Sequence, residues 1–154
     1  MIDSHNYTVT LSGTGPKTGT LTDHTLKVAL AVASPPEFGG PDGVWSPEHL
    51  FVASLSSCLM TTFQAIADLS GVEVLAYSDA AVGHLQRGED RLYKMDRVTL
   101  RPRIVVNHTQ ADRALRLIQK AEAACLISRS VNCEIVMEPD IQVVEPVGLP
   151  NLTP

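Results

Sequence analysis

The hydrophobic positions between residues 45 and 71 repeat with the period of an α-helix. Ser46 is a suitable N-cap, Pro47 suits the first helical position, and Gly71 suits the end. Such a helix is roughly 36 Å long, whereas a compact chain of this length has a radius of gyration of about 15 Å. We therefore expect one central helix that crosses the fold. Its apolar stripe consists of Phe51, Leu55, Leu59, Phe63, Ile66 and Leu69.

The other side of this predicted helix is uncharged as well. Between His49 and Asp68 it carries Ala, Ser, Thr and Met, and a helix without a charged face is usually buried on most sides. Its many hydroxyl groups and the lack of a basic flank argue against the alternative, a membrane span. One chain of 154 residues can hardly enclose such a helix alone, so we expect a partner subunit to cover part of it.

The rest of the chain predicts strands and a second helix in separate runs. The second helix begins at Thr109, ends near residues 129–131, and has its own buried side. The glycine- and proline-rich segments 13–19 and 34–44 predict a turn and a loop, and 146–154 predicts a loosely held tail. The fold class is therefore α+β with mainly antiparallel sheets, in a single domain spanning 1–154. The predicted strands are 7–11, 20–22, 26–32, 72–86, 93–106 and 133–144.

Composition excludes several classes of function. The net charge is −5 and the basic residues are scattered, which argues against nucleic acid as a partner. The five histidines show no metal-ligand spacing, and Pro16 before Lys17 breaks any likeness to a phosphate-binding loop. We therefore expect neither a metal nor a cofactor. Three widely spaced cysteines and the absence of a secretory pattern favour the reducing cytoplasm.

Cys58 and Cys125 are the candidate reactive groups. Cys58 falls midway along the first predicted helix and Cys125 in the C-terminal half of the second. Both helices have a buried side, and helices that pack on a shared core can bring two thiols together. A buried free cysteine is more often a small hydrophobic residue, which is our interpretation of Cys133. A reactive thiol must ionise, and burial raises its pKa, so we expect a cation near Cys58. Glu48, ten residues earlier, points to the same general side and could organise that cation.

Two runs resemble the OsmC/Ohr proteins, thiol-dependent peroxidases of organic hydroperoxides. These are SPEHLFVASLSSCL, with Cys ten residues after Glu, and AEAACLISRSV, which resembles the family's second-cysteine segment. The order of elements matches too, over nearly the whole chain. The resemblance implies an intertwined homodimer with two sites at its interface. It also implies that Cys58 is the peroxidatic thiol, that Cys125 is the resolving thiol, and that Glu48 holds a catalytic arginine.

The resemblance further implies a reaction. The Cys58 thiolate would reduce an organic hydroperoxide, Cys125 would condense with the resulting sulfenic acid to a disulfide, and a cytosolic dithiol would reduce that disulfide. The chain departs from the family in having no arginine before Arg87. Arg129 and Lys17 are the candidate cations in its place. The alternatives are a small-ligand-binding or redox-sensing protein without efficient peroxidase activity, and a purely structural dimer.

Overall fold

The computed structural model describes residues 4–144, so the predicted tail 146–154 lies outside the described residues. Contacts within the chain divide it into two units, Met1–Phe51 and Val52–Pro154. We describe each unit by itself, and the single-domain assignment stays a prediction.

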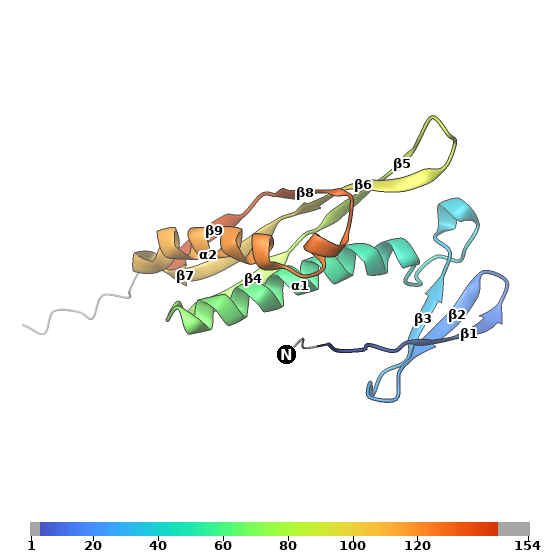
Figure 1. The fold of residues 1–154 in the computed structure, drawn as a ribbon, viewed down its shortest axis with the longest axis horizontal. Coiled ribbons are helices and arrows are strands. Elements are labelled where there is room, and N and C mark those ends of the chain that lie inside the picture. Colours follow the sequence, from blue (N-terminus) through green and yellow to red (C-terminus); the bar gives the residue numbers. More distant parts are fainter. Residues whose placement is uncertain (1–3, 145–154) are drawn as a thin grey trace, which may run out of the picture. The chain divides into compact units, whose positions relative to one another are not determined.

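The first unit is a three-stranded antiparallel sheet in the order β1-β2-β3 (Figure 1). Its strands are β1 (Thr10–Gly15), β2 (Thr18–Thr22) and β3 (Leu30–Ala33). The predicted turn at 13–19 is wrong in extent, because Gly13 pairs with Gly19 across the two strands. Only Pro16 and Lys17 turn the chain, and Lys17 takes the left-handed conformation with φ 59°.

The predicted loop at 34–44 contains one short 3₁₀ helix, η1 (Pro36–Phe38). Gly40 is required in this loop, because a Cβ there would lie 1.6 Å from the carbonyl oxygen of Ser34. The loop returns to the sheet where the Ala33 N–H donates to the Trp45 carbonyl at 2.9 Å. This bond fixes the chain directly before the long helix begins.

The predicted long helix is confirmed as α1 (Pro47–Leu69), which begins in the first unit and continues in the second. Ser46 is its N-cap, with the His49 N–H donating to Ser46 Oγ at 3.3 Å. Leu55, Leu59 and Phe63 are buried as predicted, whereas Leu69 is 88% exposed. By length and composition α1 could also cross a membrane, a property that it shares with core helices of soluble proteins.

Within this chain α1 buries only one side. The side chains of Ser57 and Thr61 are exposed, and their hydroxyls donate to backbone carbonyls of the preceding turn, those of Ala53 and Ser57, at 2.7 and 3.1 Å. The helix backbone therefore satisfies these hydroxyls locally. An exposed side without charge remains, as the sequence had led us to expect for a helix that a single chain cannot enclose.

In the second unit each predicted long strand is divided in two. Residues 72–86 form β4 (Val74–Asp79) and β5 (Val82–Arg87), 93–106 form β6 (Tyr93–Leu100) and β7 (Pro102–Asn107), and 133–144 form β8 (Glu134–Met137) and β9 (Asp140–Val144). The strands make two sheets, β4-β7-β9 and β5-β6-β8, and each sheet has one antiparallel and one parallel pair. In Figure 1 the halves follow one another as three continuous paths.

The second predicted helix is α2 (Ala111–Ala124), and both of its predicted ends are wrong. Thr109 lies in the short 3₁₀ helix η2 (His108–Gln110), and α2 stops at Ala124 because the backbone of Cys125 is extended. A further 3₁₀ turn, η3 (Ser128–Ser130), follows. The helix buries Ala114, Ile118 and Ala121 and packs against β7 and β9.

Helix α1 lies close to strands β4 and β5. A Cβ on Gly83 of β5 would lie 2.5 Å from Val52 Cγ2 and 2.8 Å from Met95 Sδ, so a larger residue there would force these side chains to shift. Phe63 of α1 packs on Tyr77 of β4 with ring centroids 6.0 Å apart. The core between helices and strands also contains Val98, Leu100, Ile104 and Val106, all fully buried. The predicted α+β class with mainly antiparallel sheets and two helices is confirmed.

Candidate thiol site

The structure brings Cys58 and Cys125 together. Cys58 lies midway along α1 and is partly buried, whereas Cys125 is the first residue after α2 and is fully buried. Both are free thiols, and the Cys125 side chain hydrogen-bonds that of Cys58. The two thiols therefore meet where α1 lies beside the end of α2.

The turn after Cys125 supplies further donors. The Arg129 N–H donates to the Cys125 carbonyl at 3.1 Å, and this bond folds residues 126–128 into a tight turn. The backbone N–H groups of Ile127 and Leu126 donate to the Cys58 sulfur. Thr62, one turn further along α1, places Oγ1 4.0 Å from Cys58 Sγ. Neutral donors thus surround Cys58 on the side that faces Cys125.

These contacts set the thiol pKa values in opposite directions. Burial raises the pKa of Cys58, but the hydrogen bonds from Cys125, Ile127, Thr62 and Leu126 outweigh it and hold the pKa below its ordinary value. Burial raises the pKa of Cys125, and the hydrogen bond with Cys58 raises it further. The proton therefore stays on Cys125, and Cys58 is the thiol that ionises first.

Neutral hydrogen-bond donors, which sequence reasoning had not considered, thus lower the pKa of Cys58. The roles of the predicted cations, Arg129 and Lys17, stay predictions. Arg129 is exposed in η3, so its predicted position on the helix of Cys125 is wrong. Lys17 belongs to the first unit, where Nζ donates to the Phe38 carbonyl at 2.6 Å.

Glu48 lies in the first turn of α1, within the first unit. Its Oε2 atom is buried and has no hydrogen-bond partner in the part of the chain that the structure describes. A buried carboxylate oxygen without a donor is costly, so this position suits a hydrogen-bond donor or a cation. The role of Glu48 stays a prediction.

Cys133 differs from the thiol pair. It is partly buried and lies one residue before β8, not within a strand as predicted. Burial raises the pKa of its thiol, and the negative charge of Asp96 adds to this rise while Lys94 opposes it. Within residues 4–144, no group of three or more His, Cys, Asp or Glu side chains is placed to hold a metal.

Sequence reasoning missed Ser128 at this site. Its Oγ atom is buried, and its side chain lies close enough to Cys125 to lower the pKa of that thiol. The Cys-x-x-Ser spacing of residues 125–128 was the available signal. The backbone donors of residues 126 and 127 left no signal, because every non-proline residue carries an N–H.

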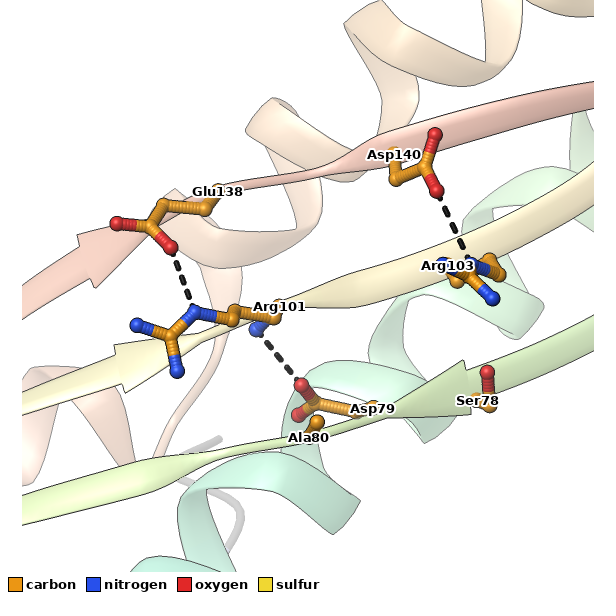
Figure 2. Close-up of a pocket in the computed structure, with 7 residues that line it drawn as sticks. All are labelled: Ser78, Asp79, Ala80, Arg101, Arg103, Glu138 and Asp140. Carbon is orange, nitrogen blue, oxygen red and sulfur yellow. Dashed lines mark hydrogen bonds and ion pairs between the residues drawn. The ribbon is translucent and has the colours of Figure 1, made fainter.

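A second polar region lies where the strands divide. The strand-break cluster consists of Asp79, Arg101, Arg103, Glu138 and Asp140, which line a cavity of about 410 Å³ together with Ser78 and Ala80 (Figure 2). Asp79 accepts the Arg101 backbone N–H at 2.7 Å and the Ser56 hydroxyl of α1 at 2.6 Å. Arg101 pairs with Glu138 at 2.6 Å, and Arg103 pairs with Asp140 at 3.0 Å.

Comparison with known proteins identifies the family. The model of the OsmC-like protein family matches residues 40–140. This chain belongs to the OsmC-like protein family. The family predicted from the two cysteine segments is therefore confirmed.

Among curated proteins similar to this chain, the uncharacterized protein YmaD of Bacillus subtilis is 26% identical over 151 residues, covering 92% of this chain and 97% of YmaD. The organic hydroperoxide resistance protein OhrA of Bacillus subtilis is 26% identical over 136 residues, covering 86% and 94%.

Among solved structures, an OsmC-like protein of unknown function from Vibrio cholerae has a TM-score of 0.80 at 23% identity, covering 88% of this chain and 99% of that one. At this identity the likeness shows the fold. It agrees with the α+β architecture described above.

Proposed function

We propose that this OsmC-like protein is a thiol-dependent peroxidase that reduces organic hydroperoxides, with Cys58 as the peroxidatic and Cys125 as the resolving thiol. The observation that carries the proposal is the pairing of the two thiols, with the proton held on Cys125 and the pKa of Cys58 lowered. A thiolate beside a second thiol is the arrangement that this chemistry needs. The similarity to a relative named as an organic hydroperoxide resistance protein supports the same reading.

The reaction runs in three steps. The Cys58 thiolate attacks the terminal oxygen of R–O–O–H, the O–O bond breaks, and the departing alkoxide takes a proton to become an alcohol. The Cys125 thiolate then attacks the Cys58 sulfenic acid, the S–O bond breaks, and a disulfide and water form. A cytoplasmic dithiol reduces the disulfide by thiol–disulfide exchange. The sum is one hydroperoxide and one dithiol converted to an alcohol, water and an oxidised dithiol.

A homodimer is part of the proposal. The exposed side of α1 carries Ser57, Thr61 and other uncharged residues, and a second copy of the chain would cover it. In such a dimer Glu48, whose buried oxygen has no partner in the described residues, would hold a cation beside the site. Arg129 and Lys17 are the cations proposed for that role.

The test is consumption of an organic hydroperoxide such as cumene hydroperoxide, coupled to oxidation of a dithiol. We expect turnover in the wild type, none in Cys58→Ser, and wild-type turnover in the control Cys133→Ser, because only Cys58 has a lowered pKa. Absence of wild-type turnover with several organic hydroperoxides and several dithiols would rule out the peroxidase.

The second candidate is a redox sensor or small-ligand-binding protein. The observation that favours it is the absence of any arginine before Arg87. A sensor would form the Cys58–Cys125 disulfide once per chain, and dithiols would reduce it again too slowly to sustain turnover. Mass spectrometry after one equivalent of hydroperoxide, with and without dithiol, separates this outcome from turnover.

A further inference from the structure

Ser128 carries a buried hydroxyl that lies beside Cys125 but makes no hydrogen bond of normal geometry to the described residues of the reduced protein. Its Oγ atom has no hydrogen-bond partner in the described part of the chain, although it lies three residues after Cys125. Burying a hydroxyl without a partner is unfavourable, and such a group calls for an explanation. The bond from the Arg129 N–H to the Cys125 carbonyl folds the turn and brings Ser128 back toward the Cys125 thiol.

We propose that Ser128 stabilises the Cys125 thiolate in the resolving step, through its hydroxyl and its backbone N–H. This inference rests on the proposed function, and it assigns Ser128 a catalytic role at the second sulfur. In the reduced protein the Cys125 thiol keeps its proton and donates a hydrogen bond to the Cys58 sulfur. The Cys125 sulfur then carries no charge, so the Ser128 hydroxyl has no strong acceptor.

Oxidation of Cys58 reverses this arrangement. The sulfenic acid is neutral, so the negative charge that kept the proton on Cys125 is gone. Cys125 must now lose its proton to attack, in a place where burial opposes ionisation. Burial and the contact with Cys58 raise the pKa of Cys125, whereas the Ser128 side chain and N–H lower it. After oxidation the negative charge of Cys58 no longer raises the pKa of Cys125. The Ser128 hydroxyl and N–H still lower it, and the Cys125 thiolate becomes their anionic acceptor.

The step balances without an external reactant. The S–S bond forms between Cys125 and Cys58 as the S–O bond of the sulfenic acid breaks. The hydroxide that leaves takes up the proton that Cys125 released, giving water. Two electrons pass from the Cys125 thiolate to the Cys58 sulfur, and no other group is oxidised or reduced.

The first experiment follows one turnover in Ser128→Ala, Ser128→Thr and Ser130→Ala. Ser130 is the matched control, because its hydroxyl lies in the same turn but donates to the Leu126 carbonyl at 2.7 Å. After one equivalent of cumene hydroperoxide, dimedone traps the sulfenic acid and mass spectrometry measures the disulfide. We expect disulfide formation at pH 7 to be about tenfold slower in Ser128→Ala, as expected for one lost hydrogen bond to a charged group. Ser128→Thr should restore the rate, and Ser130→Ala should match the wild type.

The second experiment does not depend on peroxidase activity. In the Cys58→Ser, Cys133→Ser background, thiolate absorbance at 240 nm against pH reports Cys125 alone, beside a neutral residue 58. Ser128→Ala should raise the pKa of Cys125, and Ser130→Ala should not. An unchanged Cys125 pKa, or disulfide formation at the wild-type rate, overturns the inference. Absent wild-type turnover together with a raised pKa would overturn the proposed function but support the role of Ser128.

Discussion

The thiol site and the strand-break cluster both join elements of the second unit, but they differ in how charge is stabilised. In the cluster the charged side chains pair with one another at the surface, where Arg103 and Asp140 are 66% and 45% exposed. At the thiol site one sulfur is prepared for a negative charge by neutral donors, beside a Cys125 side chain that is fully buried. Exposed pairs are screened by water, whereas hydrogen bonds in a dry site retain their strength. Paired charges therefore characterise the strand-break cluster, and neutral hydrogen-bond donors characterise the thiol site.

The largest effect is expected at the thiol site, from Cys125→Ala. This substitution removes the partner for the disulfide and the first of the hydrogen bonds that lower the pKa of Cys58. We expect the coupled turnover to fall to background and Cys58 to accumulate as sulfinic acid, because the unresolved sulfenic acid attacks a second hydroperoxide and is oxidised by it. Mass spectrometry of the treated protein measures this. Turnover that survives in Cys125→Ala, while Cys133→Ala behaves as wild type, would contradict the assigned pair.

The same variant has a consequence for pH. The hydrogen bond from Cys125 lowers the pKa of Cys58, so its loss should move ionisation of Cys58 to higher pH. Iodoacetamide should then alkylate Cys58 more slowly at neutral pH than in the wild type. For stability the sign follows from the lowered pKa. The contribution of Cys58 is present above the pKa of an unfolded cysteine, about 8.5, and is lost as the pH falls through the folded pKa.

The next effect concerns the strand-break cluster and one of its members that is not part of an exposed pair. Asp79→Ala leaves the Arg101 N–H and the Ser56 hydroxyl without their acceptor. We expect a loss of about 2–3 kcal/mol in the free energy of unfolding, measured by urea titration. A loss below about 0.5 kcal/mol would show that water replaces Asp79 at no cost.

A smaller effect of opposite sign is expected from Tyr77→Phe. The Tyr77 hydroxyl is buried without a hydrogen-bond partner in the described residues, so its removal should stabilise the fold by up to about 1 kcal/mol. Burial raises the pKa of Tyr77, and the charge of Asp79 adds to this. A raised pKa contributes stability below the unfolded value of about 10, and this is lost as the pH rises above it. Urea titrations at pH 8 and pH 11 should therefore show a smaller alkaline loss in Tyr77→Phe, and equal losses would refute the assignment.

The smallest effect is expected from Asp140→Asn in the exposed pair with Arg103. The free energy of unfolding should change by less than about 0.5 kcal/mol, because water screens this pair. The difference should shrink further when salt is added. A change as large as that of Asp79→Ala would remove the contrast between paired surface charges and the acceptor at the strand break.

Local signals in the sequence determined α1. Ser46, Pro47 and Gly71 act within one turn of the helix ends, so their chemistry is visible in a short stretch of chain. The long alternating segments likewise indicated strands. Their division was not visible, because the N–H of Arg101 is bonded to the side chain of Asp79, which lies 22 residues away. Contacts over such separations form only when the chain has folded.

The candidate site divides in the same way. Cys58, Cys125 and Glu48 could be selected from the sequence, because a thiol or a carboxylate is identified by its residue type and their spacing can be counted along the chain. The continuing apolar pattern through Ile127 hid the end of α2 at Ala124. That end creates the turn whose N–H groups and Ser128 hydroxyl face the sulfurs. Which thiol ionises first was decided by the tertiary structure alone, because it depends on where backbone donors point and on what burial removes from water.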